Sequence, residues 1–125
     1  MILAEAVCIW AFVTSILDGD TFKVKAEIWP DITVETSIRI NGIDTPEKGW
    51  RGKCKEEKKL GARATKWAKE NLPEKVLICN IKNGKYAGRV VADVFINEDK
   101  YADLIIAEGL AKPYDGGTKS DWCSK

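Results

Sequence analysis

Residues 21–40 read TFKVKAEIWPDITVETSIRI, and this stretch decides the fold. Apolar and polar side chains alternate in residues 21–28 and again in residues 32–40. A period of two is typical of strands with one buried face, and the Trp-Pro-Asp sequence at 29–31 predicts a turn between them. Residues 10–17 are also strand-like and run into a Gly-containing turn signal. We therefore expect three antiparallel strands connected as a meander.

The rest of the chain predicts two helices and two further strands. Residues 53–71 place apolar side chains on one face at helical spacing, and Pro73 stops this helix. Two strands and a second helix follow, at residues 76–81, 89–96 and 101–108.

Asp99 and Gly109 flank the second helix and are expected to act as its N-cap and its C-terminal stop. Three strands, a helix, two strands and a helix is the order of a five-stranded OB-fold barrel. The expected fold class is therefore a β-rich α+β barrel with two helices. We assign residues 1–125 to one such domain, with residues 1–9 as an N-terminal extension or the start of the first strand. Residues 113–125 are expected to form an irregular C-terminal tail.

The composition of the 125-residue chain is that of a globular protein, with 45% hydrophobic and 31% charged residues. No apolar stretch reaches the roughly 18 residues that span a membrane, so we expect no membrane partner. We also expect a monomer. Residues 1–17 are apolar, but Glu5 interrupts them and a basic start is missing, which favours a first strand over a signal peptide.

The charge is unevenly distributed. Nine Lys or Arg and two Glu lie between Lys48 and Lys69, whereas the rest of the chain has 11 basic and 17 acidic residues. A basic segment beside acidic clusters suits a protein that attracts a polyanion while holding a cation. A solvated helix face explains the individual lysines equally well.

The four cysteines lie far apart in the sequence, at Cys8, Cys54, Cys79 and Cys123. Because there is no Cys-x-x-Cys pair and no histidine, a structural zinc site is disfavoured. An even count allows one or two disulfides, and buried free thiols are the alternative. We favour one bridge that ties Cys123 to the body of the protein, with Cys54 as the first candidate partner, although the sequence leaves the pairing open.

Asp20 and Asp44 are candidate metal ligands. Asp20 ends the first turn and Asp44 follows the third strand, so a meander can bring the two together. Two neighbouring carboxylates repel unless a cation lies between them. A hard, oxygen-preferring ion such as Ca²⁺ fits, because sulfur and imidazole patterns are missing. A plain hairpin turn is the alternative explanation for Asp18-Gly19-Asp20.

Glu47 is the candidate general base. Because the chain contains no histidine, a carboxylate is the natural group to take a proton from water near neutral pH. Pro46 fixes its own backbone angle and keeps Thr45 extended, so Glu47 is held at a set position relative to Asp44. An exposed glutamate in a polar loop is the alternative.

Arg39 and Arg89 stand at the end of one expected strand and the beginning of another. Two guanidinium groups can bind phosphate oxygens and offset charge that develops at phosphorus. A surface ion pair explains either arginine alone, so the argument rests on the whole set.

Four stretches in this set resemble the staphylococcal-nuclease-like (thermonuclease) family, whose members are calcium-dependent nucleases on an OB-fold. They run in the family's order and cover about residues 10–114. The stretches are Leu17-Asp18-Gly19-Asp20-Thr21, Arg39-Ile40-Asn41-Gly42-Ile43-Asp44-Thr45-Pro46-Glu47, Lys85-Tyr86-Ala87-Gly88-Arg89 and Glu108-Gly109-Leu110-Ala111-Lys112. The family usually has Lys-Tyr-Gly-Arg in the third stretch, so Ala87 is an insertion here.

The resemblance implies a role for each matching residue. Asp20, Asp44 and the carbonyl of Thr45 would bind Ca²⁺, and Glu47 would be the general base. The arginines would hold and polarise the scissile phosphate. Three further residues would bind a terminal phosphate or stack on the nucleotide: Lys85, Tyr86 and Tyr114. The implied reaction is attack of water on phosphorus in DNA or RNA, with loss of the 5′ oxygen and a 3′-phosphate product. The family and the cysteine count together favour a secreted or periplasmic location, and the compartment stays open.

Two alternatives to a nuclease remain. One is a catalytically weak or inactive OB-fold module that binds nucleic acid or protein. The other is a structural domain that binds calcium and in which the acids only stabilise the barrel. The full set of acids and arginines favours the enzyme. Trp29 and Trp50 are candidates for stacking on bases, with Trp29 more readily explained as a cap on one end of the barrel.

Overall fold

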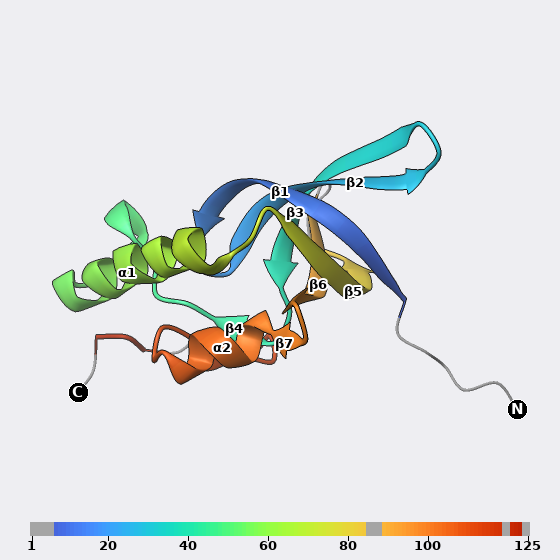
Figure 1. The fold of residues 1–125 in the computed structure, drawn as a ribbon. Coiled ribbons are helices and arrows are strands. Elements are labelled where there is room, and N and C mark those ends of the chain that lie inside the picture. Colours follow the sequence, from blue (N-terminus) through green and yellow to red (C-terminus); the bar gives the residue numbers. More distant parts are fainter. Residues whose placement is uncertain (1–6, 85–88, 119–120, 124–125) are drawn as a thin grey trace, which may run out of the picture.

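The computed structural model describes residues 7–84, 89–118 and 121–123, and Figure 1 shows a strongly curved sheet with two helices at its lower left. Eight strands are assigned: β1 Cys8–Asp18, β2 Thr21–Trp29, β3 Ile32–Ile40, β4 Ile43–Asp44, β5 Lys75–Asn83, β6 Arg89–Ile96, β7 Asp99–Lys100 and β8 Lys112–Pro113. A 3₁₀ turn, Gly49–Arg51, and two helices complete the fold, α1 Lys55–Asn71 and α2 Tyr101–Ala107.

The five long strands close into a barrel. The sheet order is β3-β2-β1-β5-β6-β7, and β3 also pairs with β6 in parallel, from Ser37 with Arg89 to Ile40 with Ala92. All other pairs along β1, β2, β3, β5 and β6 are antiparallel. A five-stranded barrel with two helices is the predicted OB-fold architecture, and the fold class is confirmed.

The core lies inside the barrel and beneath the helices. Phe22, Val24, Ile38 and Ile40 are nearly inaccessible to solvent, as the alternation in residues 21–40 predicts. The helix α2 contributes Tyr101, whose ring packs edge-on at 5.5 Å from that of Trp67 on α1. The two helices thereby meet over one end of the barrel.

Two local expectations are wrong, and one helix begins two residues later than expected. Asp99 belongs to β7, and Lys100 occupies the N-cap of α2 without a side-chain hydrogen bond. Trp29 does not cap the barrel: it is 68% exposed at the tip of the β2–β3 hairpin, which projects beyond the barrel in Figure 1. The first helix was expected to begin at residue 53 and begins at Lys55. Cys54 is its N-cap, and its Sγ accepts a hydrogen bond from the backbone N–H of Glu57.

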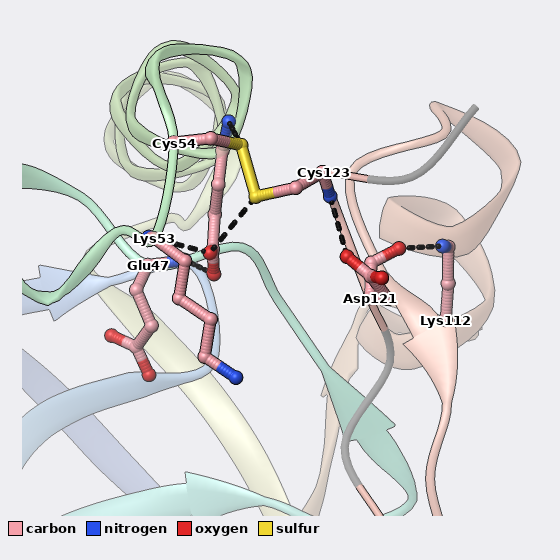
Figure 2. Close-up of a disulfide and its surroundings, with 7 residues drawn as sticks. Glu47, Lys53, Cys54, Lys112, Asp121 and Cys123 are labelled. Atoms are coloured by element: carbon pink, nitrogen blue, oxygen red, sulfur yellow. Dashed lines mark hydrogen bonds between the residues drawn. A yellow bond between two sulfur atoms is a disulfide. The ribbon is translucent and has the colours of Figure 1, made fainter.

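Two disulfides join distant parts of the chain. Cys54 is bonded to Cys123, which agrees with the predicted attachment of the tail (Figure 2). A second bridge joins Cys8 of β1 to Cys79 of β5, which are paired across the sheet. Among the described residues, helices long and apolar enough to span a bilayer are absent.

Candidate active site

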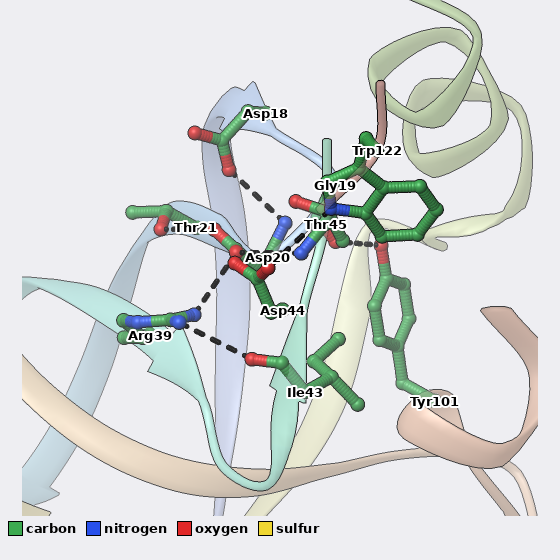
Figure 3. Close-up of polar contacts among 10 residues, drawn as sticks. All are labelled: Asp18, Gly19, Asp20, Thr21, Arg39, Ile43, Asp44, Thr45, Tyr101 and Trp122. Atoms are coloured by element: carbon green, nitrogen blue, oxygen red, sulfur yellow. Dashed lines mark hydrogen bonds and ion pairs between the residues drawn. The ribbon is translucent and has the colours of Figure 1, made fainter. Parts of the chain in front are cut away.

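The Asp18-Gly19-Asp20 turn between β1 and β2 is tightly fixed (Figure 3). The backbone N–H of Asp20 donates to Oδ1 of Asp18 at 3.0 Å, and the buried hydroxyl of Tyr101 donates to the carbonyl of Gly19 at 2.6 Å. A Cβ on Gly19 would lie 2.9 Å from Cβ of Ala64, so glycine allows α1 to approach the turn. The position of Asp20 is therefore set by contacts from both helices.

Asp20 and Arg39 form a largely buried ion pair. Nη1 of Arg39 lies 3.0 Å from Oδ2 of Asp20, and Nη2 donates to the carbonyl of Ile43 at 3.2 Å. The hydroxyl of Thr21 donates to Oδ1 of Asp20, and the N–H of Thr45 donates to Oδ2 at 3.4 Å. The last contact brings the segment after β4 against the first turn, as the meander predicts.

The charges in this cluster shift the pKa values of two carboxyl groups in opposite directions. Burial, reinforced by the charge of Asp20, raises the pKa of Asp18 to about 7, and the charge of Glu47 adds to this effect. Burial would also raise the pKa of Asp20, but hydrogen bonding with Asp18 and the charge of Arg39 hold it below its usual range. Asp20 therefore stays ionised near neutral pH, whereas Asp18 gains its charge only around pH 7.

Glu47 is positioned by α1. The buried carboxylate of Glu57 accepts hydrogen bonds from the backbone N–H of Glu47 at 3.0 Å and of Lys53 at 2.9 Å. At Gly61, a Cβ would lie 2.5 Å from the carbonyl carbon of Glu47, so the helix touches the backbone of this loop directly. Figure 2 shows the Glu47 carboxylate pointing away from α1 and from the nearby disulfide.

The predicted catalytic residues meet at one cleft. Asp20, Arg39, Glu47 and Arg89 line a pocket of about 600 Å³, together with Asp18 and the exposed Trp50. Arg89 lies at the start of β6, opposite Ser37 and two residues from the register position of Arg39. The parallel β3–β6 pairing therefore brings both guanidinium-bearing residues to the same rim.

Asp44 and Thr45 line a neighbouring pocket of about 440 Å³, which shares Glu47 with the first. Oδ2 of Asp44 accepts a hydrogen bond from Nε1 of Trp122 at 3.4 Å. The predicted metal ligands are thus divided between two adjoining pockets, with Glu47 at the boundary. The contact from Thr45 to Asp20 joins the two pockets.

Tyr114 borders a third pocket of about 450 Å³, which shares Arg39 and Arg89 with the cleft. Cζ of Arg39 lies 5.8 Å from the centre of the Tyr114 ring. Lys85 and Tyr86, the other predicted substrate-binding residues, lie outside the described residues, as does the Ala87 insertion.

The family of the chain follows from comparison with known proteins. A family model described as staphylococcal nuclease homologue matches residues 37–122. The chain belongs to this family. No curated protein matches the chain closely enough to count as a relative. Membership indicates a nuclease-type domain and a nucleic-acid substrate.

In this staphylococcal nuclease homologue, the matched region contains Arg39, Asp44, Glu47 and Arg89, whereas Asp20 precedes it. The structure connects Asp20 to the matched region: Asp20 is ion-paired with Arg39 and accepts a hydrogen bond from the backbone N–H of Thr45. The acid in the first turn is therefore part of the same site.

Three residues of the homologue's site were not assigned a role from sequence. Asp18 could have been noticed because it lies two residues before Asp20 in the same turn. Glu57 gave no such indication, because it lies in a helix whose charged residues are mostly basic. Trp122 adjoins the predicted bridging cysteine. The structure places Asp18 beside Asp20, Glu57 beneath Glu47 and Trp122 against Asp44.

The donors at this site have the right chemistry for calcium. Asp20, Asp44 and the Thr45 carbonyl offer only oxygen atoms, which Ca²⁺ prefers. Burial and then the charge of Asp20 raise the pKa of Asp18, and a cation at this site would offset the charge of the neighbouring carboxylates. Within residues 7–84, 89–118 and 121–123, no group of three or more acidic or sulfur side chains is close enough to hold a metal ion alone.

Proposed function

We propose that the protein is a calcium-dependent nuclease that hydrolyses phosphodiester bonds of DNA or RNA, breaking the P–O5′ bond and leaving a 3′-phosphate. The single observation that carries this proposal is the cleft in which Asp20, Arg39, Glu47 and Arg89 meet. It combines a proton acceptor, two phosphate-binding groups and an acid suited to a metal ion in a family of nucleases.

Glu47 takes a proton from the attacking water. The water oxygen forms the new bond to phosphorus, the P–O5′ bond breaks, and the 5′ oxygen leaves and takes a proton from solvent. The rigid attachment of the Glu47 backbone to Glu57 supports this role, since a general base must be held within hydrogen-bond reach of the water.

Arg39 and Arg89 bind the phosphate and offset the charge that develops on it. Nη1 of Arg39 is buried and faces Asp20, but its N–H groups are not aligned for a hydrogen bond with any described residue. The ion pair therefore fixes the guanidinium, and a phosphate oxygen would bind the part of Arg39 that lines the cleft. Tyr114, beside Arg39, would hold the neighbouring nucleotide together with Lys85 and Tyr86.

Asp20, Asp44 and the carbonyl of Thr45 would hold the calcium ion. When bound, the ion supplies positive charge against the carboxylates and the attacked phosphate. Trp122 orients Asp44 through its indole N–H, so the C-terminal tail is part of the support for this ligand.

The decisive test is the Glu47→Gln variant. We expect kcat on DNA to fall by about 100-fold or more, because glutamine cannot accept the proton, while calcium binding stays largely unchanged. Single-turnover hydrolysis and calcium titration measure the two effects. Glu56→Gln is the matched control, because Glu56 is an exposed glutamate on the same helix as the buried Glu57.

Parallel assays with calcium, magnesium and a chelator separate the alternatives. Cleavage with calcium and none with chelator supports the proposal, and an unchanged kcat for Glu47→Gln contradicts it. Nucleic-acid binding without cleavage under any condition would favour the inactive OB-fold module. Calcium-dependent stabilisation without any effect of nucleotide would favour the structural domain.

A further inference from the structure

The outer face of β1 carries two large aromatic side chains that remain exposed. Trp10 is 56% and Phe12 is 50% exposed, whereas Ala11 between them is completely buried. Alternate residues of a strand share a face, so both rings lie on the outside of the barrel. Clustered apolar surface of this kind marks a contact surface on a soluble protein.

Strand pairing extends this surface across the sheet. Leu77 of β5 pairs with Trp10, and Phe95 of β6 pairs with Leu77. Directly paired residues of antiparallel strands place their side chains on the same face. Both are only partly buried. We call Trp10, Phe12, Leu77 and Phe95 the outer platform.

A lysine lies within the outer platform. Lys75 pairs with Phe12, and its Nζ lies 5.0 Å from the centre of the Trp10 ring and 5.8 Å from that of Phe12. On the other side of Phe12, β2 contributes Lys25, which is itself paired with Glu35 of β3. Phe12 therefore has a lysine on each neighbouring strand. Lys75 is the better candidate for binding a phosphate at this surface, because its ammonium group lies near both aromatic rings.

We propose that the outer platform binds single-stranded nucleic acid, with bases stacked on Trp10 and Phe12 and a backbone phosphate at Lys75. Aromatic rings on a sheet surface, combined with lysines that follow the backbone, are how proteins bind unpaired bases without reading sequence. A protein partner fits less well, because lysine is depleted at the centre of protein interfaces and Lys75 lies next to both rings.

The outer platform is separate from the candidate active site. Of the described residues that line the cleft, none belongs to the platform. Both regions nevertheless share β1, in which Phe12 and Asp18 are separated by about 20 Å of extended chain. The proposal goes beyond the proposed hydrolysis and does not require it, because platform binding persists in an inactive protein.

The test measures binding of a fluorescein-labelled oligothymidylate of about 12 nucleotides by anisotropy, in the presence of a chelator. The Trp10→Ala/Phe12→Ala double variant should bind about tenfold or more weakly than the wild type. Ile32→Ala removes an apolar side chain that is 51% exposed at the tip of the β2–β3 hairpin and should change affinity less than about twofold. Lys75→Gln should reduce the dependence of log K on log salt by about one ion. Thermal melts of each variant verify folding.

Several outcomes would overturn the outer platform. Affinity unchanged in the double variant, or lowered equally by Ile32→Ala, removes the stacking argument. An abasic oligonucleotide of the same length that binds the wild type equally well does the same. If sedimentation instead shows a dimer that the double variant abolishes, the surface binds a second copy of the chain.

Oligonucleotide binding by the Glu47→Gln protein tests the platform independently of cleavage. A wild-type protein that cleaves in no calcium assay but shows platform-dependent binding would refute the nuclease and not the platform. Calcium-dependent cleavage together with unchanged oligonucleotide binding by the double variant would refute the platform alone.

Discussion

The two ends of the β2–β3 hairpin differ sharply, although they belong to the same two strands. At the cleft end, the charged residues Asp20 and Arg39 are largely buried and paired with each other. At the tip, Ile28, Trp29 and Ile32 are apolar and more than half exposed. The usual relation of polarity to burial is reversed at both ends.

The neighbours of each strand segment explain this reversal. The near half of β2 pairs with β1 from Phe12 to Asp18, and the near half of β3 pairs with β6 from Ser37 to Ile40. Beyond these positions, the pairing of β2 and β3 found among residues 7–84, 89–118 and 121–123 is with each other. A two-residue period therefore predicts which face a side chain takes, but burial depends on whether other strands cover that face.

Removing Arg39 should have the largest effect and tests whether the cleft end depends on its ion pair. Arg39→Ala leaves the carboxylate of Asp20 buried without its cation, so the free energy of unfolding should fall by about 3 kcal/mol. Trp29→Ala at the tip should change it by less than about 0.5 kcal/mol. Urea unfolding of both variants measures the difference, and equal losses would mean that the two ends do not differ energetically.

Gly61→Ala tests the contact that holds the loop of Glu47. The added methyl group would meet backbone atoms of Glu47, which cannot rotate away, so stability should fall by about 1–3 kcal/mol and kcat should fall with it. Ala62→Gly on the exposed side of α1 costs about 1 kcal/mol through helix propensity alone. A control that loses stability but keeps kcat shows that the loss of activity arises at Glu47. If kcat falls in both, Gly61 has no special role in positioning it.

Tyr101→Phe tests the support of the first turn from α2. Burial raises the pKa of Tyr101, so its hydroxyl stays protonated and donates to the carbonyl of Gly19. Removing the hydroxyl leaves that carbonyl without its buried partner and should cost about 1–3 kcal/mol. Chemical denaturation measures the loss, and a neutral result would mean that water replaces the hydroxyl.

Asp18→Asn should be neutral at low pH and stabilising at high pH, in contrast to the losses expected above. The folded pKa of Asp18 is about 7 against an ordinary 3.8, so the folded protein keeps a proton that the unfolded chain has lost between these values. Wild-type stability therefore falls as the pH rises from about 4 to about 7. Asparagine avoids this loss and still accepts from the N–H of Asp20, so the variant should melt higher than the wild type at pH 8 and equally at pH 4.

The control for this pH effect lies at the other end of the hairpin. Asp31 is an exposed acid in the tip turn, and its φ of 63° is one that asparagine tolerates. Asp31→Asn should shift the melting temperature equally at both pH values. The melting curves are recorded with a chelator present. If Asp18→Asn also shifted the melting temperature equally at pH 4 and pH 8, the raised pKa of Asp18 would not explain its effect.

The barrel was predictable because its signals are local. The alternation in residues 21–40, the helix before Pro73 and the order of strands and helices all survive in the structure. The placement of Trp29 was not predictable, since its environment depends on how far β1 and β6 extend along the hairpin. Asp99 failed as an N-cap because pairing of β7 with Ile96 takes that residue into the sheet.

The candidate site was predictable in its residues but not in its supports. Asp20, Arg39 and Glu47 stand in recognisable sequence patterns, and the fold brings them to one cleft. Glu57 carried the same signal as an exposed helical glutamate, and only the approach of the Glu47 loop makes it a buried acceptor. Contacts between segments far apart in sequence, such as Trp122 with Asp44, leave no periodic trace.

The two disulfides enclose overlapping stretches of chain, from Cys8 to Cys79 and from Cys54 to Cys123. Every peptide bond between Cys8 and Cys123 therefore lies within at least one covalent ring. A protease that cuts any one of them leaves both fragments joined, and they separate on a gel only after reduction. Because Asp20, Glu47 and Arg89 all lie inside these rings, a singly nicked molecule keeps its whole cleft on one covalent framework.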